Sequence, residues 1–177
     1  MRTSRLLLFL FILAGALAYT EADAQPGPRG NRGPRANRPA ARRAEKVHAR
    51  RVIRRTAAVI LVAQKKVKEN KVYTGNLARS VAHQRYARRL YLQGRYLRAM
   101  HHSRRARQLA ILAIKANNGT ETADMTYNKE DEEIMNAEPV SDKELEDELA
   151  KDMPNQSTKD EDFVDAVLTE IDISDLE

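Results

Sequence analysis

The chain has 177 residues with no Cys, 31 Lys and Arg residues, 25 Asp and Glu residues and a formal net charge of +6. The absence of Cys excludes disulfides, thiolate metal sites and a cysteine nucleophile, so stability must come from packing alone. Residues 25–118 carry 25 Lys and Arg against two acidic residues, whereas residues 119–177 carry 21 Asp and Glu against four Lys. This asymmetry bears on partners and solubility rather than on the fold.

Residues 1–24 are typical of a cleavable secretory signal peptide. Arg2 and Arg5 form the positive start, residues 6–19 form an apolar run, and Ala22 and Ala24 offer an A-x-A cleavage site. The run is short for a bilayer span, which needs about 20 apolar residues. We predict a secreted or periplasmic protein after cleavage near Ala24, with an uncleaved anchor as the alternative. The leader resembles those of secreted Bacteroidetes-type proteins.

Residues 25–39 are predicted to be a disordered basic arm. The segment 26–39 reads PGPRGNRGPRANRP, which leaves almost no apolar side chain to bury. A segment of this composition remains unfolded because it has no core to form. It acts either as an electrostatic tether to a polyanion or as a solvated linker.

Residues 40–118 are predicted to form a basic helical domain. Residues 40–71 contain no Gly or Pro and are rich in Ala and Arg, which favours one long helix. Its buried stripe is predicted to comprise Ile53, Ala57, Ile60, Leu61 and Val67. A turn at Gly75 and a break at Gly94 delimit a second helix over 77–92 and a third over 96–116.

The third predicted helix has a ridge of small side chains, which allows another helix to approach closely. The ridge consists of Ala99, Ser103, Ala106, Ala110 and Ala113. The predicted fold class is therefore all-α: a small three-helix bundle, or a helical hairpin plus a long helix. A disordered basic arm and an acidic, partly helical tail flank this unit.

Residues 80–112 resemble a single tetratricopeptide repeat. The matching positions are Ala87, Leu90, Gly94, Tyr96, Ala99 and Ala106. The departures are His83 for the usual Trp, Ser103 for a large aromatic residue and Ile111 for the closing Pro. The resemblance implies a helical hairpin but not a peptide groove, because about three repeats are needed for a continuous core. A hairpin that acquired similar residues independently is the alternative.

Residues 119–177 are predicted to form an acidic tail with short amphipathic helices near 141–152 and 159–173. Each begins with a capping-box pattern, at Ser141 and at Thr158. Helices of this length are marginal in water, so we expect them to fold only when docked. The candidate docking residues are Leu145, Leu149, Phe163, Val167 and Ile171. Most of 119–139 is predicted to be mobile.

Nothing in the sequence predicts catalysis, a metal site or a cofactor. His48, His83, His101 and His102 all lie in the basic region, and neighbouring side chains on a helix point about 100° apart, so His101 and His102 do not chelate. We interpret His101 and His102 as two surface or interface residues. The chain has no Gly-rich phosphate loop, no G-x-S-x-G and no H-E-x-x-H. We therefore predict that it is not an enzyme and takes no small-molecule substrate.

The charge division predicts a non-enzymatic extracytoplasmic interaction protein, whose basic helical module binds acidic or amphipathic segments, including its own tail. The alternative is a binder of polyanions such as nucleic acid, lipopolysaccharide or anionic lipid at the envelope surface, regulated by the tail. Arginine pairs bidentately with phosphate and carboxylate groups. The candidate binding residues are Arg42, Arg43, Arg50, Arg51, Arg54, Arg55, Arg88, Arg89, Arg104 and Arg105. A solvated basic face balanced by the tail is the third interpretation.

Overall fold

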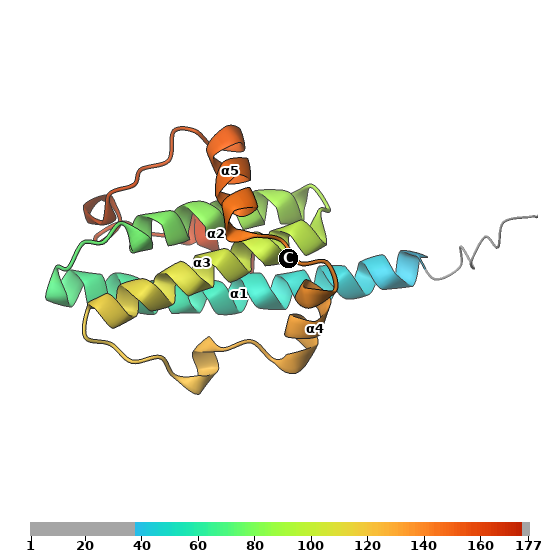
Figure 1. The fold of residues 1–177 in the computed structure, drawn as a ribbon, viewed down its shortest axis with the longest axis horizontal. Helices are drawn as coiled ribbons and strands as arrows, with labels where there is room; N and C mark the ends of the chain where they lie inside the picture. The colour runs from blue at the N-terminus through green and yellow to red at the C-terminus, as the bar shows by residue number, and fades with distance from the viewer. Residues whose placement is uncertain (1–37, 175–177) are drawn as a thin grey trace, which may run out of the picture. The chain divides into compact units, whose positions relative to one another are not determined.

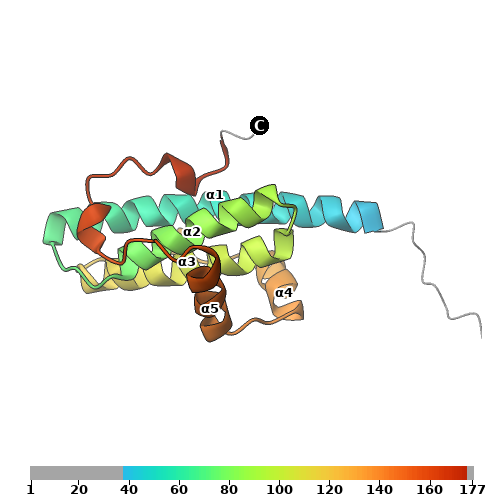
Figure 2. The ribbon, with the colours of Figure 1, turned by 90° about the horizontal axis from the view of Figure 1, so that it is seen from above.

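The computed structural model describes residues 38–174, among which there are helices and 3-10 turns but no strand. Three long helices, α1 (Arg38–Asn70), α2 (Asn76–Leu92) and α3 (Tyr96–Ala116), each pack against the other two (Figures 1 and 2). The all-α prediction is confirmed. The predicted leader and nearly all of the predicted basic arm lie outside the described residues. No helix within 38–174 is long and apolar enough to cross a membrane.

Helix α1 ends where the chain turns into the left-handed region at Lys71, with φ 58°. Ile53, Ala57, Ile60 and Val67 are buried as predicted, whereas Leu61 is 48% exposed. The inclusion of Leu61 in the stripe was wrong because it follows Ile60 directly. One residue along a helix turns the side chain by about 100°, from the core towards solvent.

Helices α2 and α3 form the predicted hairpin around Gly94, whose φ of 74° suits glycine because it has no Cβ. All five residues of the small-residue ridge on α3 are fully buried. This ridge brings α3 close to both α1 and α2. The hairpin is present, but its membership of the tetratricopeptide family remains a prediction.

The acidic tail folds back over the three helices and contains more structure than predicted. Residues 119–139, expected to be mobile, contain the 3-10 turn η2 (Ala123–Met125) and helix α4 (Lys129–Ala137). Helix α5 (Asp142–Asp152) closely matches the predicted helix, and the Ser141 hydroxyl accepts the Glu144 N–H at 3.2 Å. In Figure 1, residues 120–137 lie below the long helices and α5 lies above them.

The predicted helix over 159–173 is absent. The segment forms two 3-10 turns, η3 (Asp160–Asp162) and η4 (Thr169–Ile171), joined by irregular chain. Phe163 and Ile171 are buried as docking residues should be, but Val167 is 81% exposed, so its assignment as a docking residue was wrong. Without a helical repeat, Val167 does not share a face with its apolar neighbours.

The tail supplies part of the apolar core. One cluster of buried side chains joins the three long helices to Met125, Phe163, Leu168 and Ile171 of the tail. A second cluster, nearer the α2–α3 turn, includes Met135, Leu149 and Ile173. Removing residues 119–177 would therefore expose apolar surface of the bundle as well as its charges.

Candidate functional site

Helix α5 packs across the α2–α3 hairpin and presents a regular pattern to it (Figures 1 and 2). Leu145 and Leu149 lie one turn apart on the same face and are 3% and 8% exposed. Residues four apart share a face, so this apolar strip has one acidic pair on each side. The pairs are Asp142 with Glu146, and Glu144 with Glu148.

Two arginines of α3 each bind one of these acidic pairs. Arg105 donates to Asp142 at 2.7 Å and to Glu146 at 3.0 Å. Arg98 donates to Glu144 at 2.8 Å and to Glu148 at 2.5 Å. The forked guanidinium suits this task because its donors diverge in one plane.

Further cations reinforce both sides of α5. Arg79 of α2 donates to Glu146 at 2.6 Å, and Arg95 donates to Glu148 at 3.2 Å. Glu146 and Glu148, the two inner acids, thus each contact two arginines. Charge-assisted hydrogen bonds of this kind are stronger than neutral ones, which makes the two glutamates the main polar anchors of α5.

A buried pair of histidines lies beneath α5. The side chains of His83 on α2 and His102 on α3 are fully buried, and their Nδ1 atoms are 3.0 Å apart. Each Nε2 faces a glutamate: His83 Nε2 is 3.3 Å from Glu146, and His102 Nε2 is 3.4 Å from Glu148. The Tyr86 ring packs edge-on against His102.

The protonation states follow from these contacts. The pKa of Glu146 falls to about 2, mainly because the His83 imidazole, 3.3 Å away, favours its charged form, with Arg105 and Arg79 also contributing. The pKa of His102 falls to about 3 because burial and the charge of His83 both disfavour its protonated form. Burial and a hydrogen bond to Asp152 raise the pKa of the Tyr86 hydroxyl. Tyr86 therefore donates, at 3.1 Å to Glu148 and 2.5 Å to Asp152.

We define the α5 site by three residues on each helix of the hairpin, at positions i, i+4 and i+7. These residues are Arg79, His83 and Tyr86 on α2 and Arg98, His102 and Arg105 on α3. The spacing places each set along one face of its helix. The two sets converge under α5 because the hairpin turns at Gly94.

Of these six residues, only Arg105 is among the binding residues predicted from the sequence, because that prediction took pairs of arginines adjacent in the chain. The usable signal was the helical spacing Arg-x3-His-x2-[Tyr/Arg], which occurs once on each predicted helix of the hairpin. The interpretation of His101 and His102 as surface or interface residues also needs correction, because both are buried. The partners of His102 are His83 and a tail glutamate.

The ten predicted arginines are distributed over several surfaces. Arg51 donates to the buried carboxylate of Asp131 in α4 at 2.5 Å, and Arg55 lies 4.0 Å from it. Arg89 donates to the Asp152 carbonyl and Arg104 to Asn136, both at 3.2 Å. Arg42 and Arg43 are exposed near the start of α1. Arg105 belongs to the α5 site described above. The other three, which also have contacts, are Arg50, Arg54 and Arg88.

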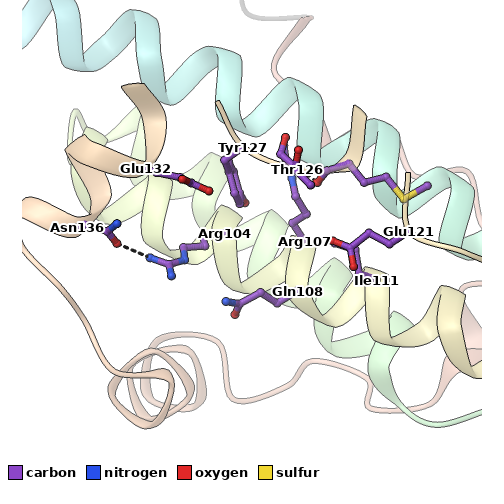
Figure 3. A pocket seen from close by; sticks show the side chains of 10 residues that line it. Arg104, Arg107, Gln108, Ile111, Glu121, Thr126, Tyr127, Glu132 and Asn136 are labelled. Carbon is purple, nitrogen blue, oxygen red and sulfur yellow. Dashed lines mark hydrogen bonds between the residues drawn. The ribbon is translucent and has the colours of Figure 1, made fainter. Parts of the chain in front are cut away.

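A cavity of about 380 Å³ lies between α3 and the segment around Tyr127 (Figure 3). Its wall includes Arg107, a buried guanidinium that donates to Thr56 at 3.1 Å and to the Thr126 carbonyl at 3.2 Å. The guanidinium carbon lies 3.9 Å from the centre of the Tyr127 ring. Burial lowers the pKa of Arg107. Because its donors go to neutral oxygens of α1 and the tail, Arg107 is a structural tie rather than a ligand-binding residue.

No protein-family model, curated protein or solved structure matches the chain. Within residues 38–174, no group of three or more His, Asp or Glu side chains is arranged to hold a metal ion.

Proposed function

We propose that this protein is a non-enzymatic interaction protein that works outside the cytoplasm, and that its basic helical module binds acidic amphipathic helices in competition with its own α5. The observation that carries the proposal is the match of pattern at the α5 site. Arg98 and Arg105 span two acidic pairs that flank one strip of leucines. A surface that holds one helix of this pattern is suited to hold another.

The way α5 is attached supports its role as an exchangeable occupant. Only two of its apolar side chains, Leu145 and Leu149, are buried, and its other contacts are ion pairs and hydrogen bonds. Partly exposed ion pairs each contribute about 0–1 kcal/mol. The chain on either side is anchored independently, by Met135 before α5 and by Phe163 and Ile171 after it. Release of α5 therefore withdraws Leu149 from the second core cluster, while Met135, Phe163 and Ile171 keep the rest of the tail packed.

Because α5 is tethered to the bundle, a competing partner needs a high affinity to displace it. A segment joined by flexible chain acts at an effective concentration of about a millimolar. The segments beside α5 are short and irregular, around Pro139 and around Pro154. A partner must therefore bind the α5 site more tightly than α5 itself does, or must bind when the attachment of α5 is weakened.

The test uses the full mature chain, because deleting the tail would strip residues from the core. A labelled peptide covering residues 138–156 is titrated against the wild type and against the variant Leu145→Ser/Leu149→Ser, which weakens the resident helix. We expect the peptide to bind the variant at least about tenfold more tightly than the wild type. A peptide carrying the same two serine substitutions is the matched control, since its charge is unchanged. Equal binding to both proteins, or none, would contradict the proposal.

Polyanion binding is the second candidate function, favoured by the exposed cations near the start of α1. Arg42, Arg43 and Lys46 are all exposed there. Polyanion affinity falls steeply with salt because counterions are released, whereas docking of an amphipathic helix retains an apolar part that salt does not screen. Measuring heparin and peptide binding at two salt concentrations separates the two functions.

A further inference from the structure

The arrangement of the buried histidines suggests how the α5 site distinguishes one acidic helix from another. This inference rests on the proposed function, since it concerns the same site. Glu146, His83, His102 and Glu148 lie in a row: Glu146 is 3.3 Å from His83 Nε2, the two Nδ1 atoms are 3.0 Å apart, and His102 Nε2 is 3.4 Å from Glu148. The first approach is at ion-pair distance without hydrogen-bond geometry, and His83 Nε2 has no other partner. Both glutamates belong to α5, and both histidines are fully buried in the hairpin.

Counting protons along this chain gives the charge of the pair. A ring nitrogen without a proton would set its lone pair against the carboxylate, so each approach to a glutamate favours an N–H on the histidine. The hydrogen bond between the Nδ1 atoms needs one more proton. Three contacts require three protons, whereas two neutral imidazoles supply two. With α5 docked, the pair is satisfied when it carries one additional proton and a single positive charge.

We infer that the His83–His102 pair recognises a docking helix by two carboxylates two residues apart, and that docking of such a helix takes up one proton from solvent. The spacing follows from helix geometry. Residues two apart project about 200° from each other, so Glu146 and Glu148 pass on opposite sides of the leucine strip. The paired rings lie beneath the strip and reach both sides.

The charges around the pair limit it to one additional proton. The groups that face it from the packed elements are Arg79 and Tyr86 of α2, Arg98 and Arg105 of α3, Arg95 beside α3, and Glu146, Glu148 and Asp152 of α5. The low pKa of His102, caused by burial and by the charge on His83, agrees with a pair that does not bind a second additional proton.

Release of α5 removes the carboxylates and leaves the arginines. In that state the surrounding charge is positive, which favours a neutral pair because like charges disfavour the protonated imidazole. Docking therefore weakens as the pH rises, because the docked pair holds a proton that the released pair does not. A helix with only one of the two glutamates leaves a buried imidazole N–H without an acceptor, which is costly.

The first test measures the protonation of the two histidine rings directly in the full mature chain. The protein is labelled with 15N-histidine, and the ring nitrogen shifts are followed from about pH 5 to 8. We expect His83 and His102 together to hold one additional proton near neutral pH. Two neutral rings over the whole range would overturn the inference.

Two charge-matched double variants isolate the carboxylates that touch the rings. Glu146→Gln/Glu148→Gln removes them, together with partners of Arg79 and Arg95. Asp142→Asn/Glu144→Gln removes the same number of charges and keeps to Arg105 and Arg98, without touching an imidazole. We expect only the first variant to lose the additional proton. Loss in both variants, or in neither, would overturn the inference.

The same substitutions in the labelled peptide test recognition of a helix added in trans. Against the Leu145→Ser/Leu149→Ser protein, the Glu146→Gln/Glu148→Gln peptide should bind about tenfold more weakly than the Asp142→Asn/Glu144→Gln peptide. Equal affinities would overturn the recognition rule. If no peptide binds, the proposed function fails, whereas the ring titration still decides the protonation of the pair.

Discussion

The carboxylate of Asp160 accepts the backbone N–H of Ala78 at 2.8 Å across 82 residues of sequence. Its other oxygen accepts the N–H groups of Thr74 and Gly75, also at 2.8 Å. Gly75 precedes α2 and has no side chain to cap it. The tail therefore supplies the N-terminal cap of α2, with a negative charge at the positive end of the helix dipole.

Replacing this cap should measurably destabilise the protein. Asp160→Ala leaves three backbone donors without their acceptor, and loss of an N-cap costs about 0.5–2 kcal/mol. We expect a decrease in the free energy of unfolding in this range or slightly above it, measured by urea denaturation. Glu161→Ala is the matched control because Glu161 is exposed. Equal stabilities of the two variants would show that the cap contributes nothing.

Enlarging a small residue on α3 should overpack the bundle. Ala106 is fully buried within the ridge that faces the other helices. Ala106→Leu is expected to lower the free energy of unfolding by about 1–3 kcal/mol. Ala116→Leu adds the same atoms at an exposed position of the same helix and should have little effect. An unchanged melting temperature for Ala106→Leu would contradict the close packing of α3.

Replacing Arg107 by lysine should destabilise the protein, because Arg107 links α3 to α1 and to the tail. Its guanidinium donates to Thr56 and to the Met125 and Thr126 carbonyls. Lysine cannot reproduce this planar fork, and each buried acceptor left unpaired costs about 1–3 kcal/mol. Arg107→Lys should therefore lose about 2 kcal/mol or more in chemical denaturation. Arg104→Lys, three residues earlier on the surface of α3, is the control, and an equal loss there would contradict the prediction.

Stability should fall in acid partly through Glu146. Its folded pKa of about 2 lies below the ordinary value of 4.5, because His83 and the arginines favour its charged form. A lowered folded pKa gives stability that is present above the unfolded pKa and lost as the pH falls towards the folded pKa. Unfolding midpoints measured at about pH 5, 4, 3 and 2.5 should thus fall less steeply in Glu146→Gln than in the wild type. Parallel profiles would contradict this assignment, and Asp142→Asn provides a comparison at an exposed member of the same pair.

Local sequence signals were sufficient for most of the helices. Gly75 precedes α2, and Gly94 lies in the turn between α2 and α3, as predicted. The capping box at Ser141 begins α5. Each of these signals acts within a few residues of the chain. The same kind of signal failed at Thr158. There the carboxylate of Asp160 binds the start of α2, and Phe163 and Ile171 are buried without forming a helical face.

The sequence by itself determined the charge division, the helical hairpin and the acidic amphipathic character of residues 142–152, since these depend on composition and on helical spacing. Only the tertiary structure decided which acids meet which arginines. With many cations and many acids on one chain, charge alone does not select among pairings, and ion pairs at the surface differ little in energy. The buried tail side chains set the position of the tail, and that position places Glu146 and Glu148 over a histidine pair whose members are 19 residues apart.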